Sequence, residues 1–329
     1  MKAVNGEELD LENDYNFLML CNDFIVDILK CADKYQWSSE KIDIKEKDIK
    51  KFNSSKYDIF YFREHGYATV INRSLYKYIV FSLVADYNTY VFDAIDCALR
   101  YHFGTAFTLL RKPFKDDLLL LEMIYVKGYR FVPEFLNKPI KNFSIDKITK
   151  EEKKKILRKC CKKINFFTGK RMYDLRYEKS SKESLEKIWN KTSHIITNAK
   201  DYATEDGNLN IKFATEDIVE ENLVYFYKVC CSVQLYFVTL LLNILKDEEL
   251  ISEECFNQNM GNLYFAFSCT LENDLPEEIV KSIILKCNHC GSITNITSKM
   301  INKNNKNKTF KYKCVHCKKE SIINGFILS

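Results

Sequence analysis

The amino-acid sequence predicts a mainly α-helical protein, a multi-helix bundle that ends in a small β-rich module. Apolar residues make up 46% of the 329 residues, and over long segments they recur at three-to-four spacing, which is the period of an amphipathic helix. Glycine and proline are scarce, at 9 and 4 residues, whereas folds of many short strands need turn-forming residues. The C-terminal segment is different in character. We therefore assign residues 1–280 to a helical domain and residues 281–329 to the small module.

The first half of the chain is predicted to hold three long helices. Residues 8–35, 75–101 and 104–126 show helical periodicity, and Pro113 is expected to break or kink the third of these helices. We expect the lysine-rich stretch that follows the first helix to extend from the bundle and to be exposed. The next segment, DIFYFREHGYATVIN at 58–72, is β-branched and aromatic with a central glycine, a pattern that favours a short hairpin.

In the second half, serine and threonine residues mark where helices begin. Thr149 and Ser180 are each followed three residues later by glutamate, which is the capping-box pattern that satisfies the free N–H groups of a first helical turn. We expect these helices to run to about residue 164 and about residue 192. After a polar loop, Thr215 is expected to cap a long helix that ends near Lys246. A further helix at 252–271 and a linker at 273–276 complete the helical domain.

One segment is apolar enough to be tested as a membrane span. The run VCCSVQLYFVTLLLNIL, residues 229–245, carries no charge, but it is shorter than the roughly 20 residues that a spanning helix needs, and it contains polar side chains. We predict that it is the central buried helix of a soluble bundle, with no membrane contact. The N-terminus lacks the apolar core of a signal peptide, and the 13 cysteines fit reduced thiols, so we expect a cytoplasmic protein.

Two Cys-x-x-Cys pairs give the strongest functional signal in the sequence. Two residues between thiolates allow one tight turn to aim both sulfurs at a metal, and two such turns complete a closed tetrahedral shell. The pairs are Cys287 with Cys290 and Cys314 with Cys317. A module of this size cannot bury enough apolar surface by itself, whereas zinc can supply about 10–16 kcal/mol of apparent folding free energy.

This segment resembles a zinc ribbon, and the resemblance covers about residues 285–329. It implies a structural Zn²⁺ ion held by the four cysteines, in a shell with no open position for catalysis. His289 and His316 lie inside the two pairs, and we interpret both as bystanders because four thiolates already fill the shell. Residues 310–313 and 321–328 are expected to form strands of the ribbon.

Lysines give the ribbon its charge. From Lys286 to the C-terminus there are nine lysines, no arginine and one glutamate, whereas the preceding residues carry a small net negative charge. Six of these lysines are expected to form a basic, mobile hairpin tip that contacts nucleic-acid phosphates: Lys299, Lys303, Lys306, Lys308, Lys311 and Lys313. The absence of arginine from the ribbon disfavours sequence-specific base readout. Nonspecific or structured-RNA contact and docking of a partner protein both remain open, as does a solvated surface loop.

In the helical domain, one predicted helix carries a polar stripe. Asp86, Asp93, Asp96 and Arg100 fall on one face of the helix over residues 75–101. This stripe is either a solvent face, with an i,i+4 ion pair between its last two members, or a charged groove against another helix. In the second case Arg111, Lys112, Asp116, Asp117 and Glu122 are the candidate partners.

A few other polar residues are candidates for acid–base or phosphate chemistry. His194 ranks first among the histidines because a long polar loop follows it, and Arg171 and Arg176 lie five residues apart with aromatic residues between them. The two arginines either pair at the surface with Asp174 and Glu178 or contact a phosphate near His194. The catalytic candidates are His194, Arg171, Arg176, His102 and Arg100.

The helical segments Ala-Leu-Arg-Tyr-His-Phe at 98–103 and Leu-Leu-Arg-Lys-Pro-Phe at 109–114 are similar to those of bacterial abortive-infection proteins, including the HEPN-like ribonucleases. The resemblance covers about residues 75–250 and implies a role in antiviral defence. The HEPN motif places histidine four to six residues after arginine, whereas Arg63–His65 and Arg100–His102 are two apart, so no catalytic role is transferred. Three hypotheses follow: an RNA-, DNA- or protein-binding protein, a metal-independent ribonuclease, and a regulatory subunit without nucleic-acid contact.

Overall fold

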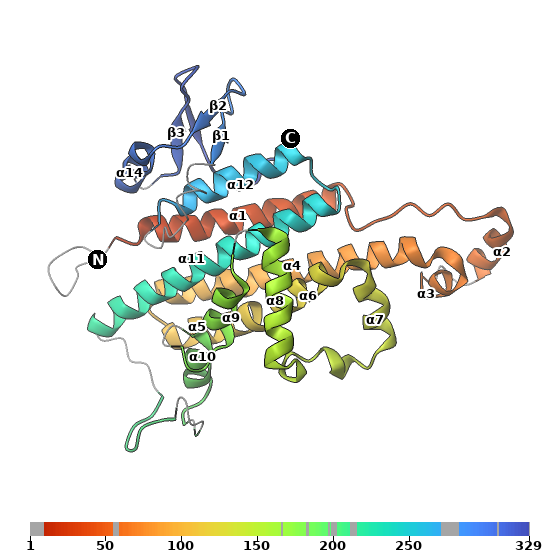
Figure 1. The fold of residues 1–329 in the computed structure, drawn as a ribbon, viewed down its shortest axis with the longest axis horizontal. Coiled ribbons are helices and arrows are strands. Elements are labelled where there is room, and N and C mark those ends of the chain that lie inside the picture. The colour runs from red at the N-terminus through yellow and green to blue at the C-terminus, as the bar shows by residue number, and fades with distance from the viewer. Residues whose placement is uncertain are drawn as a thin grey trace.

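The structure, a computed structural model, describes residues 10–54, 59–165, 167–181, 184–196, 198, 203–210, 216–270, 283–307 and 309–328. In the helical body, α1 (Glu12–Lys34), α4 (Ala68–Leu99), α11 (Glu216–Asp247) and α12 (Glu253–Phe267) run lengthwise. Helix α8 (Lys150–Ile164) stands across them, and short strands form a module at one end of the molecule (Figure 1). The predicted fold class, a helical bundle with a small C-terminal β module, is confirmed.

The core of the body lies where α1, α4 and α11 meet. The ring of Tyr87 on α4 stacks on that of Phe237 on α11, with ring centroids 3.6 Å apart, and Phe17 on α1 meets Phe267 on α12 edge to face. Among the described helices only α11 is long and apolar enough to cross a membrane, and 89% of its most apolar stretch is buried inside the protein. Helix α11 is therefore the central buried helix that the sequence predicts.

The third predicted helix is interrupted, as its proline suggests. Helix α5 (Phe103–Arg111) and helix α6 (Leu118–Lys127) are joined by a π-helical turn over Lys112–Asp117. Pro113 lies at the start of this turn, where its missing N–H removes a helical hydrogen bond and the extra residue of a π-turn accommodates the ring. The kink that the sequence predicts at this position is confirmed.

The hairpin predicted over residues 58–72 is wrong. The described part of this segment forms α3 (Ile59–Phe62), a π-helical turn over Arg63–Tyr67 and the first turns of α4. Gly66 adopts a φ of +103°, which kinks the helical path without reversing the chain. The β-branched and aromatic residues that suggest strands instead bury one helical face, since Phe62 and Ile71 are both in the core.

The described part of the body also contains several shorter helices. They are α2 (Glu46–Ser54), α7 (Phe131–Asn137), α9 (Gly169–Tyr177) and α10 (Leu185–Ser193). The capping box of Thr149 is confirmed, because its hydroxyl accepts from the Glu152 amide and the Glu152 carboxylate accepts from the Thr149 amide. The capping box predicted at Ser180 is wrong, since α10 begins after Ser184, whose hydroxyl caps the amide of Glu186. The predicted cap at Thr215 and the linker at 273–276 lie outside the described residues.

The C-terminal module consists of two antiparallel hairpins. Strand β1 (Ile284–Lys286) pairs with β2 (Ile293–Asn295), and β3 (Lys311–Lys313) pairs with β4 (Glu320–Ile322). The lysine-rich segment between the hairpins is the helix α14 (Ser298–Asn307), which corrects the prediction that it forms a hairpin tip.

The module packs against α1 and α12. The side chain of Asn259 on α12 both donates to and accepts from the backbone of Ile327, at 2.8 and 2.9 Å. Close approach depends on Gly261, because a Cβ atom there would lie 2.3 Å from the carbonyl oxygen of Ile284. Leu285 and Tyr312 of the module are buried in one continuous cluster with the helical core.

Candidate metal centre

The four cysteines lie in the turns of the two hairpins. Cys287 follows β1 and Cys314 follows β3, so each Cys-x-x-Cys pair occupies the loop that reverses the chain. Their four Sγ atoms lie within 4.8 Å of one another. Cys290 contacts Cys314 across 24 residues of sequence, and Cys287 contacts Cys317 across 30. The fold therefore brings together the thiols that the sequence identifies as ligands.

The spacing of the sulfur atoms fits a tetrahedral metal site. The Sγ atoms of Cys287 and Cys317 are 3.7 Å apart, and those of Cys290 and Cys314 are also 3.7 Å apart. A tetrahedron with Zn–S bonds of about 2.3 Å has edges of about 3.8 Å. A disulfide needs sulfurs at about 2.05 Å, and all four cysteines are free thiols. The cluster can therefore hold one metal ion.

The two Cys-x-x-Cys turns repeat the same hydrogen bonds. In the first, the amide of Gly291 donates to the carbonyl of Cys287 at 2.9 Å; in the second, Lys318 donates to Cys314 at 3.1 Å. Both turns need a left-handed residue after the second cysteine, with φ of +71° at Gly291 and +63° at Lys318. Glycine adopts this conformation without cost, whereas lysine does not.

Backbone amides stabilise the negative charge of the thiolates. The N–H of His289 donates to Cys287 Sγ and that of His316 donates to Cys314 Sγ, both at 3.4 Å. The bond from His289 is the main reason that the pKa of Cys287 is lowered to about 6. The His289 ring bonds the carbonyl of Glu320 instead of facing the cluster. This agrees with the bystander role predicted for that histidine.

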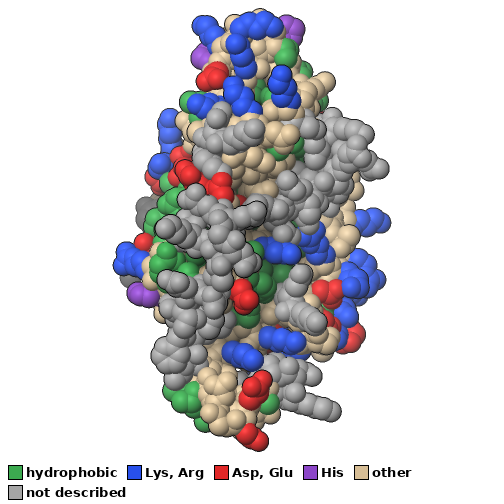
Figure 2. Space-filling model, turned by 90° about the vertical axis from the view of Figure 1, so that its left-hand side faces the viewer, with side chains coloured by type: hydrophobic (Ala, Val, Ile, Leu, Met, Phe, Trp, Pro, Cys, Tyr) green, Lys and Arg blue, Asp and Glu red, His purple; other side chains and the backbone are tan. Residues whose placement is uncertain are grey.

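Lysines surround a small cavity beside the cluster. Lys299 and Lys303 of α14 and Lys311 and Lys313 of β3 line a cavity of about 210 Å³, together with Glu320. Basic side chains, drawn in blue, gather over this end of the molecule (Figure 2), and in the ribbon all of them are lysines. Of the six lysines named from the sequence, these four are brought together. Lys308 and the side chain of Lys306 lie outside the described residues.

Arg176 lies in the core, so the surface pairing predicted for it is wrong. Its guanidinium is fully buried and donates to both carboxylate oxygens of Glu122, at 2.6 and 2.9 Å. Glu122 also accepts from the hydroxyl of Tyr236 at 2.7 Å. Burial raises the pKa of Glu122, and Arg176 opposes that rise. The sequence signal for this pair was a lone glutamate in the apolar run LLLLEMIY.

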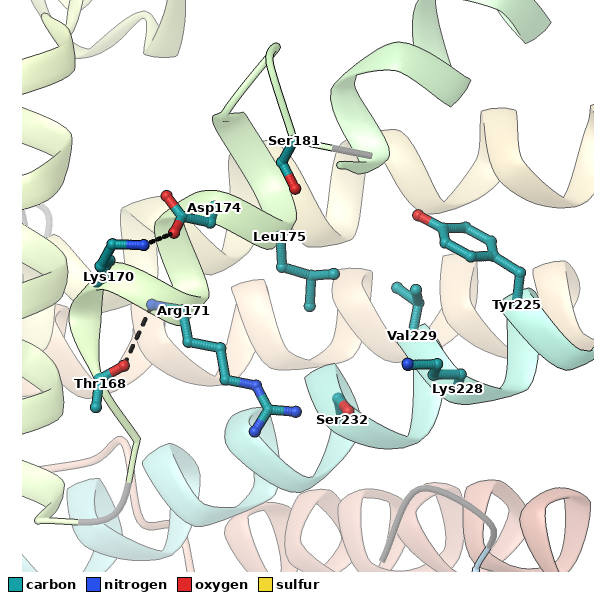
Figure 3. Close-up of a pocket in the computed structure, with 10 residues that line it drawn as sticks. All are labelled: Thr168, Lys170, Arg171, Asp174, Leu175, Ser181, Tyr225, Lys228, Val229 and Ser232. Atoms are coloured by element: carbon teal, nitrogen blue, oxygen red, sulfur yellow. Dashed lines mark hydrogen bonds and ion pairs between the residues drawn. The ribbon is translucent and has the colours of Figure 1, made fainter. Parts of the chain in front are cut away.

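Arg171 lies on the opposite side of α9 from Arg176. It points into a cavity of about 400 Å³ between α9 and α11, which Lys228 and Ser232 line from α11 (Figure 3). Lys170 lines the same cavity and is paired with Asp174 at 2.5 Å. His194 follows the end of α10 and is not among the residues that line this cavity. Arg171 and Arg176, both named as catalytic candidates, therefore do not share a site.

The polar stripe of α4 divides into two parts. Asp96 and Arg100 form an exposed i,i+4 ion pair at 2.9 Å, which is the solvent-face alternative, and Asp93 is exposed as well. Asp86 instead pairs with Lys112 of the π-helical turn, which is the helix-to-helix alternative. His102 is exposed just before α5.

Comparisons with models of known protein families, with curated proteins and with solved structures found no match. The resemblance to abortive-infection and HEPN-like proteins, and the antiviral role it implies, stay predictions.

Proposed function

We propose that this protein holds a structural zinc ion at Cys287, Cys290, Cys314 and Cys317 and uses the surrounding ribbon to bind the backbone of nucleic acids without reading their sequence. The observation that carries this proposal is the convergence of four lysines on one cavity beside the cysteine cluster. Lysine is a compact point charge suited to phosphate, whereas base readout uses the planar fork of arginine.

The zinc ion would act by fixing the two hairpins, and with them the lysines. Lys311 and Lys313 lie on the strand that leads into Cys314, so the metal holds their spacing. Asn304 holds α14 against the same strand, because its side chain accepts from the amide of Lys311 at 2.8 Å. The one acidic residue at the cavity, Glu320, lies 3.9 Å from Lys303, too far for a strong hydrogen bond.

The form of nucleic acid follows from the aromatic residues. Proteins that bind single-stranded nucleic acids stack the bases on exposed aromatic rings. In the described part of the ribbon, Phe310 and Tyr312 are buried and Phe326 packs on Phe24 of the body. The ribbon is therefore suited to a double-helical backbone, and we propose structured RNA before DNA, since double-stranded RNA is bound mostly through shape and phosphate contacts.

The test is fluorescence anisotropy with a labelled RNA hairpin and a DNA duplex of the same sequence, over a range of salt concentrations. The variant K299Q/K303Q/K311Q/K313Q should bind more weakly. The negative slope of log affinity against log salt concentration should become shallower by about 3 to 4, because four phosphate contacts are lost. The matched control, K41Q/K45Q/K47Q/K50Q, removes four exposed lysines at the other end of the body and should bind like wild type. Equal binding by both variants would contradict the proposal.

A second candidate is docking of a partner protein. Ile284 and Ile293 lie on the same outer face of the β1–β2 hairpin and are 47% and 58% exposed, and Ile322 of β4 is 57% exposed. Exposed isoleucines that share one face, as Ile284 and Ile293 do, are typical of protein contacts. Full RNA affinity in the four-lysine variant would favour this second candidate over the first. I284S/I293S would then remove the exposed isoleucines, and an unchanged zinc content would show that its metal site is intact.

A further inference from the structure

We propose that the groove between α6, α7 and α8 binds an amphiphilic anion, a small molecule with a hydrocarbon chain and a carboxylate or phosphate head. This groove is separate from the ribbon and takes no part in the function proposed above. Its volume of about 780 Å³ lies in the range typical of pockets for small ligands.

The rim of the groove is strongly basic. Six cationic residues line it against two acidic residues: Lys127, Arg130, Lys138, Lys147, Lys155 and Lys159 against Glu134 and Glu152. Both acids are already engaged. Glu134 accepts from Lys127 and Lys138, and Glu152 completes the capping box of α8.

The remaining cations form no ion pair within the described part of the chain, although the capping-box hydrogen bonds and the Lys155 ammonium do lower the pKa of the nearby Glu152 carboxyl. Arg130, Lys147, Lys155 and Lys159 are exposed, and none forms an ion pair with another described residue. Lys155 and Lys159 stand one turn apart on α8, and like charges at this spacing destabilise a helix. A bound anionic head would relieve that repulsion and could accept hydrogen bonds from two or more of these side chains.

The floor of the groove is apolar. Met123 and Val126 of α6, Phe143 and Ile148 of the connection to α8, and Ile156 of α8 line it. Phe143 packs edge to face on Phe135, with ring centroids 5.2 Å apart. A hydrocarbon chain would cover these side chains at about 25 cal/mol per Å² of apolar surface removed from water. An inorganic anion or a nucleic-acid backbone would leave the floor in contact with water, which is why we assign an amphiphile.

The test is displacement of the fluorescent fatty-acid probe dansyl-undecanoate from the full chain, below the critical micelle concentration of each competitor. Laurate and dodecyl phosphate should both displace the probe, and the stronger of the two identifies the preferred head group. Dodecyl maltoside, which has the chain without the charge, and inorganic phosphate, which has the charge without the chain, should displace it at least tenfold less well.

Variants locate the site. R130Q/K159Q should weaken binding of laurate and dodecyl phosphate about tenfold or more, whereas the control K141Q/K162Q removes two exposed lysines that do not line the groove and should bind like wild type. Circular dichroism verifies that both variants are folded. Equal displacement by dodecyl maltoside, equal displacement by inorganic phosphate, displacement by the RNA hairpin, or no difference between the two variants would each overturn the proposal.

Discussion

The cysteine cluster of the ribbon and the Arg176–Glu122 pair of the body are both polar centres, but the first is partly exposed and the second is fully buried. The strands around the cysteines are three residues long, too short to fold alone. Arg176 on α9 and Glu122 on α6 are instead fully buried in the helical core, where the Arg176 guanidinium donates to the backbone carbonyl of Phe114 and lies over the ring of Tyr236.

The ribbon depends on its polar centre for folding, whereas the helical body would fold around the Arg176–Glu122 pair with little net gain from it. Binding of a metal ion by the ribbon would itself supply folding free energy, because the unfolded chain has no preformed site. A buried ion pair gains Coulomb energy but loses hydration, so its net contribution is small, while the loss of one partner leaves a buried unpaired charge. The four predictions below test this contrast, in order of the size of the expected effect.

Removal of one metal ligand should have the largest effect. We expect wild-type protein to contain one zinc ion per chain and C314S to contain none, with loss of an apparent stabilisation of about 10–16 kcal/mol in the ribbon. Elemental analysis measures the zinc, and hydrogen exchange of the amides in 284–323 measures the folding of the ribbon. C97S, which changes a half-buried thiol outside the cluster, is the control and should match wild type. Retained amide protection in C314S would contradict the prediction.

Removal of one partner of the buried pair should have the next largest effect. R176M should lower the free energy of unfolding by about 3–5 kcal/mol, because Glu122 would then be buried without its countercharge. R176M/E122Q should recover most of this loss, since glutamine removes the charge and still accepts from Tyr236. Urea unfolding monitored by circular dichroism measures both variants. If the double variant is no more stable than R176M, the loss in R176M comes from the missing ion pair itself and not from the unpaired charge of Glu122.

The sequence predicted those features that depend on neighbouring residues. The Cys-x-x-Cys spacing fixes each metal-binding turn locally, the capping box of Thr149 needs only three further residues, and the apolar run at 229–245 has to be buried wherever it lies. For these elements the structure agrees with the sequence.

Features that depend on distant contacts could not be predicted in this way. Glu122 lies 54 residues before Arg176, and nothing near either residue identifies the other as its partner. Asn259 binds Ile327 across 68 residues, so docking of the ribbon on α12 has no local signal. In the segment 58–72, β propensity was overridden by the burial of Phe62 and Ile71 on a helical face.

Asp117 offers an intermediate case, a buried acid with incomplete pairing, and predicts a pH dependence. Burial, reinforced by a hydrogen bond with Asp86, raises its pKa to about 7, while the Lys112 ammonium is 4.0 Å away. Because the folded protein keeps this proton to higher pH than the unfolded chain does, the stability of wild type should fall as the pH rises from about 4 to about 7, by about 2–4 kcal/mol. D117N should lack that part of the decrease. The free energy of unfolding of both proteins at pH 4.5 and pH 8 measures the effect, and parallel losses in the two proteins would contradict it.

The smallest effect should distinguish the two turns of the metal centre from each other. G291A places a Cβ atom on a residue with φ of +71°, where only Lys286 Cε comes within 4 Å, so its cost of about 1 kcal/mol is one of backbone conformation. K318G relieves the same strain in the second turn and should stabilise the ribbon by about 0.5 kcal/mol, after the entropy that glycine adds to the unfolded chain. The midpoint of ribbon unfolding in a chelator titration should shift in opposite directions for the two variants. Shifts of the same sign would contradict this prediction. They would mean that the two turns differ in more than the residue that follows the second cysteine, although both turns make the same hydrogen bonds.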